Sequence, residues 1–179
     1  MERSIGKLII EKLALTDYAE LLDAMKESYP GWSGSFWSLK SLEKLIEKFP
    51  EGQLVIKADD KVVGCALSII VDYDRFGDEH TYKEITGSYT FNTHDPNGIT
   101  LYGIEVFIHP EFRGLRLGRR LYAARKELCE ELNLKSIVFG GRIPNYHNYS
   151  ESMPPKEYIQ KVKSKEIYDP VLSFQLSND

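Results

Sequence analysis

The order of the amino acids predicts a mixed α/β (α+β) fold, with helices flanking a single sheet. Two apolar β segments meet at Asp59-Asp60, a residue pair that suits the tight turn of an antiparallel hairpin. Residues 101–139 have the pattern strand, helix, strand, which places two parallel strands in one sheet. At 179 residues, 42% of them hydrophobic, the chain can bury one core, and we expect residues 1–179 to form a single domain.

The segment before the hairpin predicts one strand and two helices. A strand is expected from Lys7 to Leu15, after which Thr16-Asp17 supplies a capping residue for a helix that ends at Pro30-Gly31. A second helix is expected from about Ser38 to Phe49, because its apolar residues keep helical spacing. The hairpin strands follow at 53–58 and 61–71.

The remaining elements follow a long connection. Residues 72–99 are 28 residues rich in Tyr, Phe, His, Asp and Gly, and we interpret them as either a functional insertion or a mobile flap. A strand to Ile108 and a helix from about Leu115 to Leu132 come next, with Asn133 as a left-handed stop. The expected later pieces are a strand at 136–139, a loop at 140–146, a polar helix at 155–165 and a short amphipathic piece at 169–176.

Composition argues against several classes of function. Lys and Arg total 23 and Asp and Glu total 27, so the net charge is −4. Setting aside four arginines between 113 and 120 leaves 19 basic residues against 27 acidic ones, so the positive charge is local and we expect no nucleic-acid partner. Neither a signal peptide nor a membrane span is evident, which predicts a soluble, cytoplasmic protein with no membrane association. Cys65 and Cys129 lack metal-ligand spacing, and we expect reduced thiols and no metal site.

The segment EFRGLRLGRR is the most informative part of the chain. Its arginines, at 113, 116, 119 and 120, lie at the positive end of the helix macrodipole, which costs about 0.3–1 kcal/mol for each exposed charge. The first turn of a helix also leaves backbone N–H groups unpaired, and an anion would accept hydrogen bonds from them. We therefore expect a phosphate-binding turn, with a solvated basic helix end that binds no ligand as the alternative.

Order and motif together resemble the GNAT superfamily of acetyl-coenzyme A-dependent N-acetyltransferases, from Lys7 onward and most strongly at HPEFRGLRLGRRL. In that family the turn after a splayed strand, patterned Arg/Gln-x-x-Gly-x-Gly/Ala, gives its amides to the coenzyme pyrophosphate. Arg113 and Gly118 match this pattern, whereas Arg116 replaces its first glycine and excludes any conformation that only glycine tolerates. The resemblance implies acetyl-CoA as the cosubstrate. It also implies a mixed, mostly antiparallel central sheet that splays between two parallel strands.

The resemblance also implies a set of site residues. Glu105 is the only carboxylate inside the central strand, and we expect it to be the general base, with an exposed strand residue as the alternative. Some family members carry a catalytic Glu at the position of Tyr102, which strand alternation would place on the opposite face from Glu105. The expected coenzyme-binding residues are Phe107, Ile108, Arg113, Gly114, Leu115, Arg116, Leu117, Gly118, Arg119 and Asn145.

The general acid is harder to place. Many family members carry a Tyr in a late helix that begins Asn-Pro, but the nearest positions here, 174–176, are Phe, Gln and Leu, which donate no phenolic proton. Tyr146 is taken as the substitute because it lies near this segment, and Tyr149 and Tyr168 are equivalent choices. A structural tyrosine is the alternative for each.

The run from Glu105 to Tyr146 and the segment DPVLSFQLSN resemble the N-terminal GNAT domain of bifunctional proteins. In those proteins a carbon–nitrogen hydrolase (nitrilase-like) domain follows. GNAT folds continue past such a segment with two more strands, which this chain does not supply. We therefore expect either a domain boundary near Asp179 or completion of the sheet by another chain, as in a homodimer.

Three functions stay open at this stage. In the first, a bound small-molecule or peptide amine attacks the thioester of acetyl-CoA directly, and the acidic remainder of the chain and the aromatic insertion would suit a cationic amine. In the second, the chain is a non-catalytic acyl-CoA-binding module that regulates an attached nitrilase-like hydrolase domain. In the third, the basic helix end meets an acidic protein partner.

Overall fold

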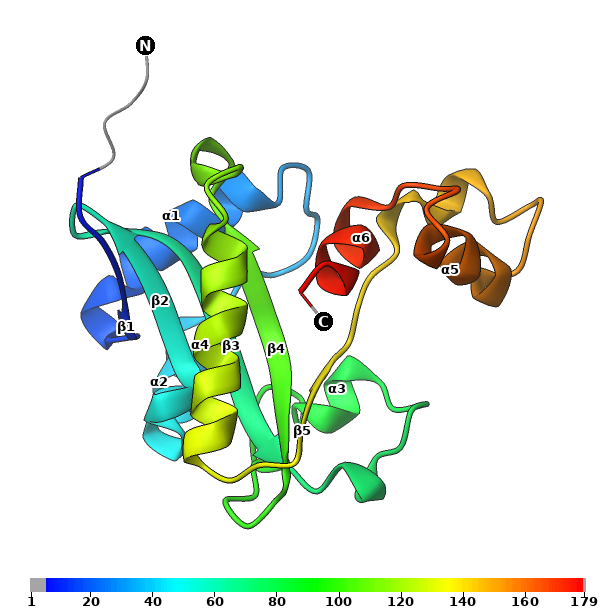
Figure 1. Ribbon diagram of the computed structural model, residues 1–179. Helices are drawn as coiled ribbons and strands as arrows, with labels where there is room; N and C mark the ends of the chain where they lie inside the picture. Colours follow the sequence, from blue (N-terminus) through cyan, green and yellow to red (C-terminus); the bar gives the residue numbers. More distant parts are fainter. Residues whose placement is uncertain (1–5, 179) are drawn as a thin grey trace. The chain divides into compact units, whose positions relative to one another are not determined.

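The computed structural model describes residues 6–178 and consists of two compact units, Met1–Phe139 and Gly140–Asp179. The first unit contains a five-stranded sheet in the order β1-β2-β3-β4-β5 (Figure 1). All neighbours are antiparallel except β4 and β5, which are parallel, so the mixed and mostly antiparallel sheet is confirmed. The strands are β1 (Leu8–Lys12), β2 (Gln53–Ala58), β3 (Lys61–Val71), β4 (Thr100–Ile108) and β5 (Ser136–Phe139).

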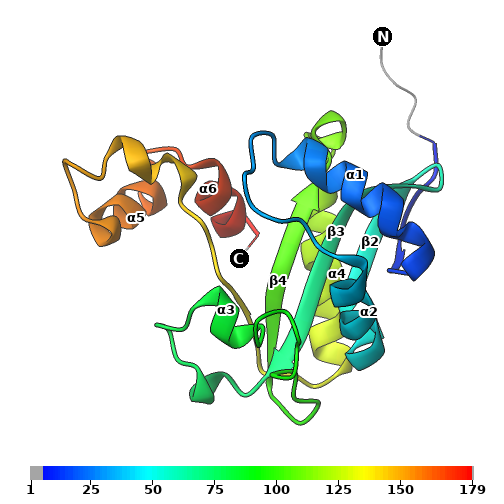
Figure 2. The same ribbon diagram turned by 180° about the vertical axis from the view of Figure 1, so that it is seen from behind.

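Helices cover both faces of this sheet (Figures 1 and 2). The helices α1 (Tyr18–Ser28) and α2 (Leu39–Lys48) lie on one face, and α4 (Leu117–Glu131) lies on the other. The connection from β3 to β4 carries the short α3 (Tyr82–Ile85). Single turns of 3-10 helix are η1 (Leu15–Asp17), η2 (Pro50–Gly52), η3 (Tyr73–Arg75) and η4 (Pro110–Phe112).

Local chemistry explains why the expected elements form where they do. Asp59 and Asp60 have φ values of 48° and 67°, the left-handed pair that a two-residue hairpin turn requires. The Ser38 side chain accepts a hydrogen bond from the amide of Ser41 and thereby caps α2. Asn133, with φ 54°, ends the helix before β5 as predicted.

The core follows the alternation of the strands. Along β3, Cys65 packs into the cluster under α1 and α2, whereas its neighbour Ala66 packs into the cluster under α4. Leu21 and Leu45 are buried in the first cluster, and Leu121 is buried in the second. Because each face is covered, β3 is buried along almost its whole length and holds the centre of the sheet in place.

The second unit is helical in the part that the structure describes. It contains η5 (Pro144–Asn148), α5 (Pro155–Lys163) and α6 (Pro170–Leu176), and residues 140–178 contain no strand. Asp169 is completely buried and accepts hydrogen bonds from the amides of Val171 and Leu172, which caps α6. The same carboxylate accepts from the Tyr158 hydroxyl at 2.8 Å. The expectation that residues 1–179 form one domain stays a prediction.

No helix within residues 6–178 has both the length and the apolar character needed to cross a membrane.

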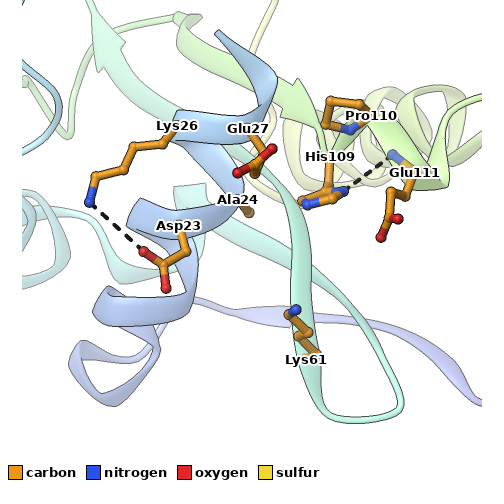
Figure 3. A pocket seen from close by; sticks show the side chains of 8 residues that line it. All are labelled: Asp23, Ala24, Lys26, Glu27, Lys61, His109, Pro110 and Glu111. Atoms are coloured by element: carbon orange, nitrogen blue, oxygen red, sulfur yellow. Dashed lines mark hydrogen bonds and ion pairs between the residues drawn. The ribbon is translucent and has the colours of Figure 1, made fainter. Parts of the chain in front are cut away.

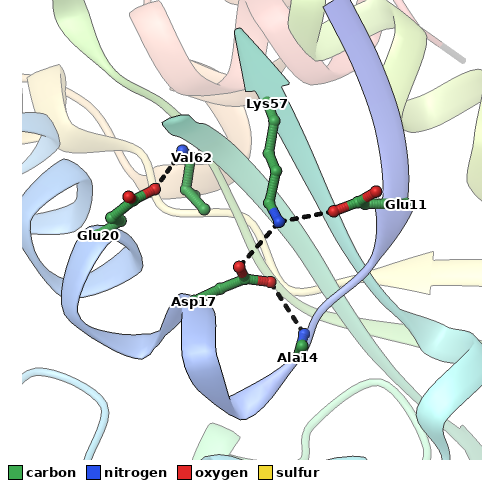
Figure 4. A network of polar contacts seen from close by, with 6 residues as sticks. All are labelled: Glu11, Ala14, Asp17, Glu20, Lys57 and Val62. Carbon is green, nitrogen blue, oxygen red and sulfur yellow. Dashed lines mark hydrogen bonds and ion pairs between the residues drawn. The ribbon is translucent and has the colours of Figure 1, made fainter. Parts of the chain in front are cut away.

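An ion-pair network joins β2 to the entrance of α1 (Figure 4). The Lys57 ammonium lies 2.6 Å from the Glu11 carboxylate and 2.8 Å from that of Asp17. The hydrogen bonds to Asp17 and Glu11 raise the pKa of Lys57 above its ordinary value. Asp17 is the N-cap residue of α1, as the sequence predicts, but its side chain makes no capping hydrogen bond because its oxygens accept from the Ala14 amide and bind Lys57.

We predict that Lys57→Met lowers the free energy of unfolding by about 2–3 kcal/mol, because it leaves the nearly buried Asp17 carboxylate without its cation. Urea denaturation measures the change. Lys12→Met is the matched control, since its partner Glu51 and Lys12 itself are 45% and 62% exposed, and it should change stability by less than about 0.5 kcal/mol. Equal effects of the two substitutions would contradict the network's role.

We predict that Tyr158→Phe destabilises the second unit by about 1–2 kcal/mol, because buried Asp169 loses a donor. Burial and the bond to Asp169 raise the pKa of Tyr158 to about 12, against about 10 in an unfolded chain. The contribution is therefore complete below about pH 10 and is lost as the pH rises toward 12. Hydrogen exchange of the α6 amides measures both effects, and an unchanged alkaline limb in the variant would refute the assignment.

Candidate functional site

The turn between β4 and α4 presents a row of unused backbone donors. Gly114 has φ 82°, and Arg116 has φ 58° and ψ 21°, so the chain turns sharply before α4 begins at Leu117. Within residues 6–178, the backbone amides of 114–119 make no hydrogen bond with the protein. These amides precede the first intrahelical bond of α4, so they can donate to an anion.

Arg116 occupies the left-handed region, which glycine adopts most readily. The sequence suggested that arginine at this position would exclude a conformation that only glycine tolerates, and the structure shows a left-handed conformation that arginine can adopt at a cost of about 1–2 kcal/mol. Strain of this kind persists where the surroundings require it, and it often marks a functional site. Arg116 therefore adopts the backbone conformation that glycine usually supplies, and it adds a guanidinium group to the turn.

The arginines of the turn divide into two groups. Arg113 donates to the carbonyl of Ile108 from Nε and to that of Ser28 from Nη2, both at 3.3 Å, so it braces the turn against the ends of β4 and α1. Arg116, Arg119 and Arg120 are exposed, and none of them forms an ion pair within the described chain. Three cations beside six unused amides form a strongly anion-attracting surface.

The two parallel strands part at Gly103. The β4–β5 ladder runs from Thr100↔Ser136 to Gly103↔Phe139. Beyond this pair β4 continues to Ile108, paired with β3 but no longer with β5. Phe107 is buried and meets the Tyr29 ring edge-on at 6.1 Å, so its side chain has a packing role, and its assignment to coenzyme binding stays a prediction. The Ile108 carbonyl accepts from Ser28 and Arg113. We define the diverging segment 103–108 together with Phe139 as the fork.

Glu105 lies in the fork with donors around its carboxylate. Oε1 accepts from the Tyr29 hydroxyl at 2.7 Å and from the amide of Val106 at 3.1 Å, and Oε2 accepts from Trp37 Nε1 at 3.3 Å. All of these partners donate, as an ionised carboxylate requires. Glu105 is half-buried, and its carboxylate is in contact with protein donors.

A β-bulge changes the face on which Glu105 lies. Leu67 pairs with Glu105 and Ser68 with Gly103, which leaves Ile104 as an extra residue in β4. Beyond the bulge, each side chain of β4 therefore lies on the face of the sheet opposite to the one that regular alternation would give it. Tyr102 packs in the cluster under α1 and α2, and Glu105 bonds Trp37 of that same cluster. The expectation that Tyr102 and Glu105 lie on opposite faces is wrong for this reason.

The 72–99 insertion is folded against β4. His80 Nε2 lies 2.8 Å from the Tyr102 hydroxyl, and its Nδ1 contacts the Gly77 carbonyl. A carbonyl can only accept, so Nδ1 carries a proton, and in the neutral imidazole Nε2 then accepts from the Tyr102 hydroxyl. The Tyr82 hydroxyl donates to the Ile104 carbonyl, and burial followed by the Glu105 charge raises the pKa of Tyr82. These contacts give the insertion a role in shaping the site.

Tyr29, Trp37, His80 and Tyr82 were missed as site residues by sequence reasoning. A signal existed in YPGWSGSFW, residues 29–37, where aromatic side chains are concentrated in a Gly/Ser-rich loop. No comparable signal marked His80. Its role depends on a contact across 22 residues of chain.

Asn145 and Tyr146 belong to the second unit. The Asn145 amide group donates to the Tyr168 carbonyl at 3.2 Å. The Tyr146 hydroxyl donates to the Met153 carbonyl at 3.0 Å, and its ring packs on Tyr158. Both side chains therefore have structural partners inside their own unit, and their assignment to the site stays a prediction.

A separate pocket lies between α1, the start of β3 and η4 (Figure 3). His109 lines it and lies at the corner between β4 and η4, where its Nδ1 accepts a hydrogen bond from the amide of Glu111. The lining mixes acidic and basic side chains and includes neither the turn at 114–119 nor Glu105: Asp23, Ala24, Lys26, Glu27, Lys61, His109, Pro110 and Glu111.

Comparison with known proteins gives consistent results. Residues 18–150 match the model of the acetyltransferase (GNAT) family. The "Probable hydrolase YhcX" of Bacillus subtilis (strain 168) is 42% identical over 172 residues, which are 96% of this chain and 33% of that protein. The chain thus spans about a third of the length of this relative.

Two further comparisons cover most of both chains. The "Uncharacterized N-acetyltransferase YkwB" of the same organism is 30% identical over 176 residues, which are 97% of this chain and 78% of that protein. The crystal structure of the loading GNATL domain of CurA from Lyngbya majuscula matches with a TM-score of 0.80 at 23% identity, over 96% of this chain and 83% of that one, and shows the same fold. By the family match and the extent of the second relative, the chain belongs to the acetyltransferase (GNAT) family.

Proposed function

We propose that the chain is an N-acyltransferase that moves the acyl group of a coenzyme A thioester to an amine, with acetyl-CoA as its simplest donor. The observation that carries this proposal is the row of unused amides at 114–119 beside three exposed arginines. A pyrophosphate would supply negative charge for the arginines and hydrogen-bond acceptors for the amides. The family assignment supports the same ligand.

The fork is where the chemistry would take place. The pantetheine arm would lie along the unpaired edge of β4, which brings the thioester near Glu105. Glu105 would take a proton from the amine, whose nitrogen then bonds to the thioester carbon while the carbon–sulfur bond breaks. The leaving thiolate would be protonated by a nearby phenol. Tyr29 is one candidate, since its hydroxyl already lies 2.7 Å from Glu105, and Tyr146 is the candidate from the second unit.

A small-molecule or peptide amine is the proposed acceptor. Aromatic rings lie next to the Glu105 carboxylate, since Trp37 bonds it and stacks on Phe91 at 5.7 Å. A carboxylate and ring faces together favour a cationic amine. Equal rates with neutral amines and with polyamines at low ionic strength would exclude this preference.

A second function is favoured by the 42% identical relative, which is named a hydrolase and is three times as long as the matched region. The chain would then be an acyl-CoA-binding module that regulates a nitrilase-like domain. Calorimetric titration with acetyl-CoA, followed by a thiol-release assay against a panel of amines, separates the two functions. Binding with release supports the transferase, binding without release supports the module, and absence of binding excludes both.

We predict that Arg116→Gly stabilises the fold by about 0.5–1 kcal/mol, because it removes a left-handed non-glycine residue. The same change should weaken acetyl-CoA binding by about 1 kcal/mol, because a phosphate contact is lost. Thermal unfolding and calorimetry measure the two effects. Arg116→Lys is the control that keeps the charge and the strain, and similar affinity of the Gly and Lys variants would contradict the phosphate contact.

We predict that Glu105→Gln lowers kcat by about 10²–10³-fold while changing the affinity for acetyl-CoA by less than about twofold, because a general base acts on the amine and not on the coenzyme. Stopped assays across pH measure kcat, and the acidic limb of the profile should disappear. Glu47→Gln is the control: it changes an exposed carboxylate of α2 and should leave kcat unchanged. A parallel loss of coenzyme affinity in the Glu105 variant would indicate a structural role.

A further inference from the structure

Arg125 of α4 is a buried cation at the centre of the sheet. Its side chain is among the largest that are fully buried, at 1% exposure. Nη2 donates to the carbonyls of Leu67 and Glu105, both at 2.6 Å, and Nε donates to the Ser68 hydroxyl at 3.1 Å. These acceptors are all neutral, and they belong to the bulge between β3 and β4.

The remaining nitrogen, Nη1, has no hydrogen-bond partner in the described chain. A Cβ placed on Gly103 would lie 3.1 Å from it, so Nη1 lies beside this glycine. Gly103 and Phe139 form the last pair of the β4–β5 ladder. The unused donor therefore lies at the apex of the fork, where the two strands begin to diverge.

The surroundings of the guanidinium supply little compensation for its charge. No carboxylate of the described chain forms an ion pair with it. The charge of Glu105 favours the charged guanidinium from a distance, but the Glu105 carboxylate is itself bonded to Tyr29, Trp37 and its neighbouring amide. Burial lowers the pKa of Arg125 to about 10, which still leaves it charged at neutral pH. The Phe139 ring, 5.1 Å from Cζ, offers a cation–π contact. A cation that is buried without an anion is costly, so an anionic ligand at Nη1 would be bound strongly.

We propose that the apex of the fork is a carboxylate subsite, at which Arg125 Nη1 holds the free carboxylate of an acyl group derived from a short dicarboxylic acid. This inference rests on the proposed function, because it assumes that the acyl chain of a coenzyme A thioester enters the fork. Gly103 leaves space beside the subsite, since a Cβ at this position would lie 3.1 Å from Nη1 itself. The carboxylate would take the place that the Phe139 ring now has over the guanidinium.

Matched thioesters test the proposal. Calorimetric titration of the full chain with succinyl-CoA and butyryl-CoA compares acyl groups with equal numbers of carbons, and malonyl-CoA with propionyl-CoA forms a second pair. In at least one pair the carboxylated thioester should bind about tenfold to a hundredfold more tightly, as expected for a charge-assisted hydrogen bond in a buried site. Equal affinities within both pairs would overturn the inference even if free coenzyme A binds. Failure of free coenzyme A to bind would overturn the proposed function as well.

Two variants separate the subsite from the structural role of Arg125. Arg125→Met should abolish the preference within the pair while leaving the affinity for free coenzyme A within about threefold. Ser68→Ala removes one of the bulge contacts of Arg125 but leaves Nη1 intact, and it should retain the preference. A preference that survives in Arg125→Met would overturn the assignment. If that variant does not fold, the comparison of thioesters in the unaltered protein decides the question by itself.

Discussion

The Arg125 guanidinium ties α4 to the bulge between β3 and β4, and the rest of the first unit depends on this contact. The register of the β3–β4 ladder shifts between Leu67 and Ser68, and Arg125 donates to the carbonyls of Leu67 and Glu105 at this point. A buried carbonyl that lacks a donor costs about 1–3 kcal/mol, so the irregular strand needs this side chain. One residue therefore stabilises the bulge, joins the helix to the sheet and carries positive charge to the point where β4 and β5 separate.

The bulge in turn determines the chemistry of the fork. Because Ile104 is an extra residue, Glu105 shares a face with Tyr102, where Tyr29, Trp37 and the 72–99 insertion converge. A regular strand would have pointed Glu105 toward α4 and away from these donors. The divergence of β4 and β5 beyond Gly103 opens the fork, and aromatic residues of this chain supply the surroundings of the carboxylate.

The turn between β4 and α4 shows a different balance between stability and the proposed function. Its left-handed Arg116 and its exposed cations at the entrance of α4 both oppose folding, whereas each favours binding of an anion. Arg113 is the exception, because its contacts with Ile108 and Ser28 stabilise the turn itself. Within one short motif, Arg113 thus stabilises the turn, whereas the exposed arginines attract an anion. Their contacts in the structure distinguish the two groups.

The sequence by itself determined most of the strands and longer helices, the hairpin at Asp59-Asp60, the parallel pair of strands and the arginine-rich turn before α4. Each of these follows from interactions between residues close in the chain, such as turn conformation, capping and helical spacing. Only the tertiary structure decided the face of Glu105, the pairing of His80 with Tyr102 and the unused donor of Arg125. These features depend on a strand register that slips by one residue and on contacts between distant segments, which local periodicity does not encode.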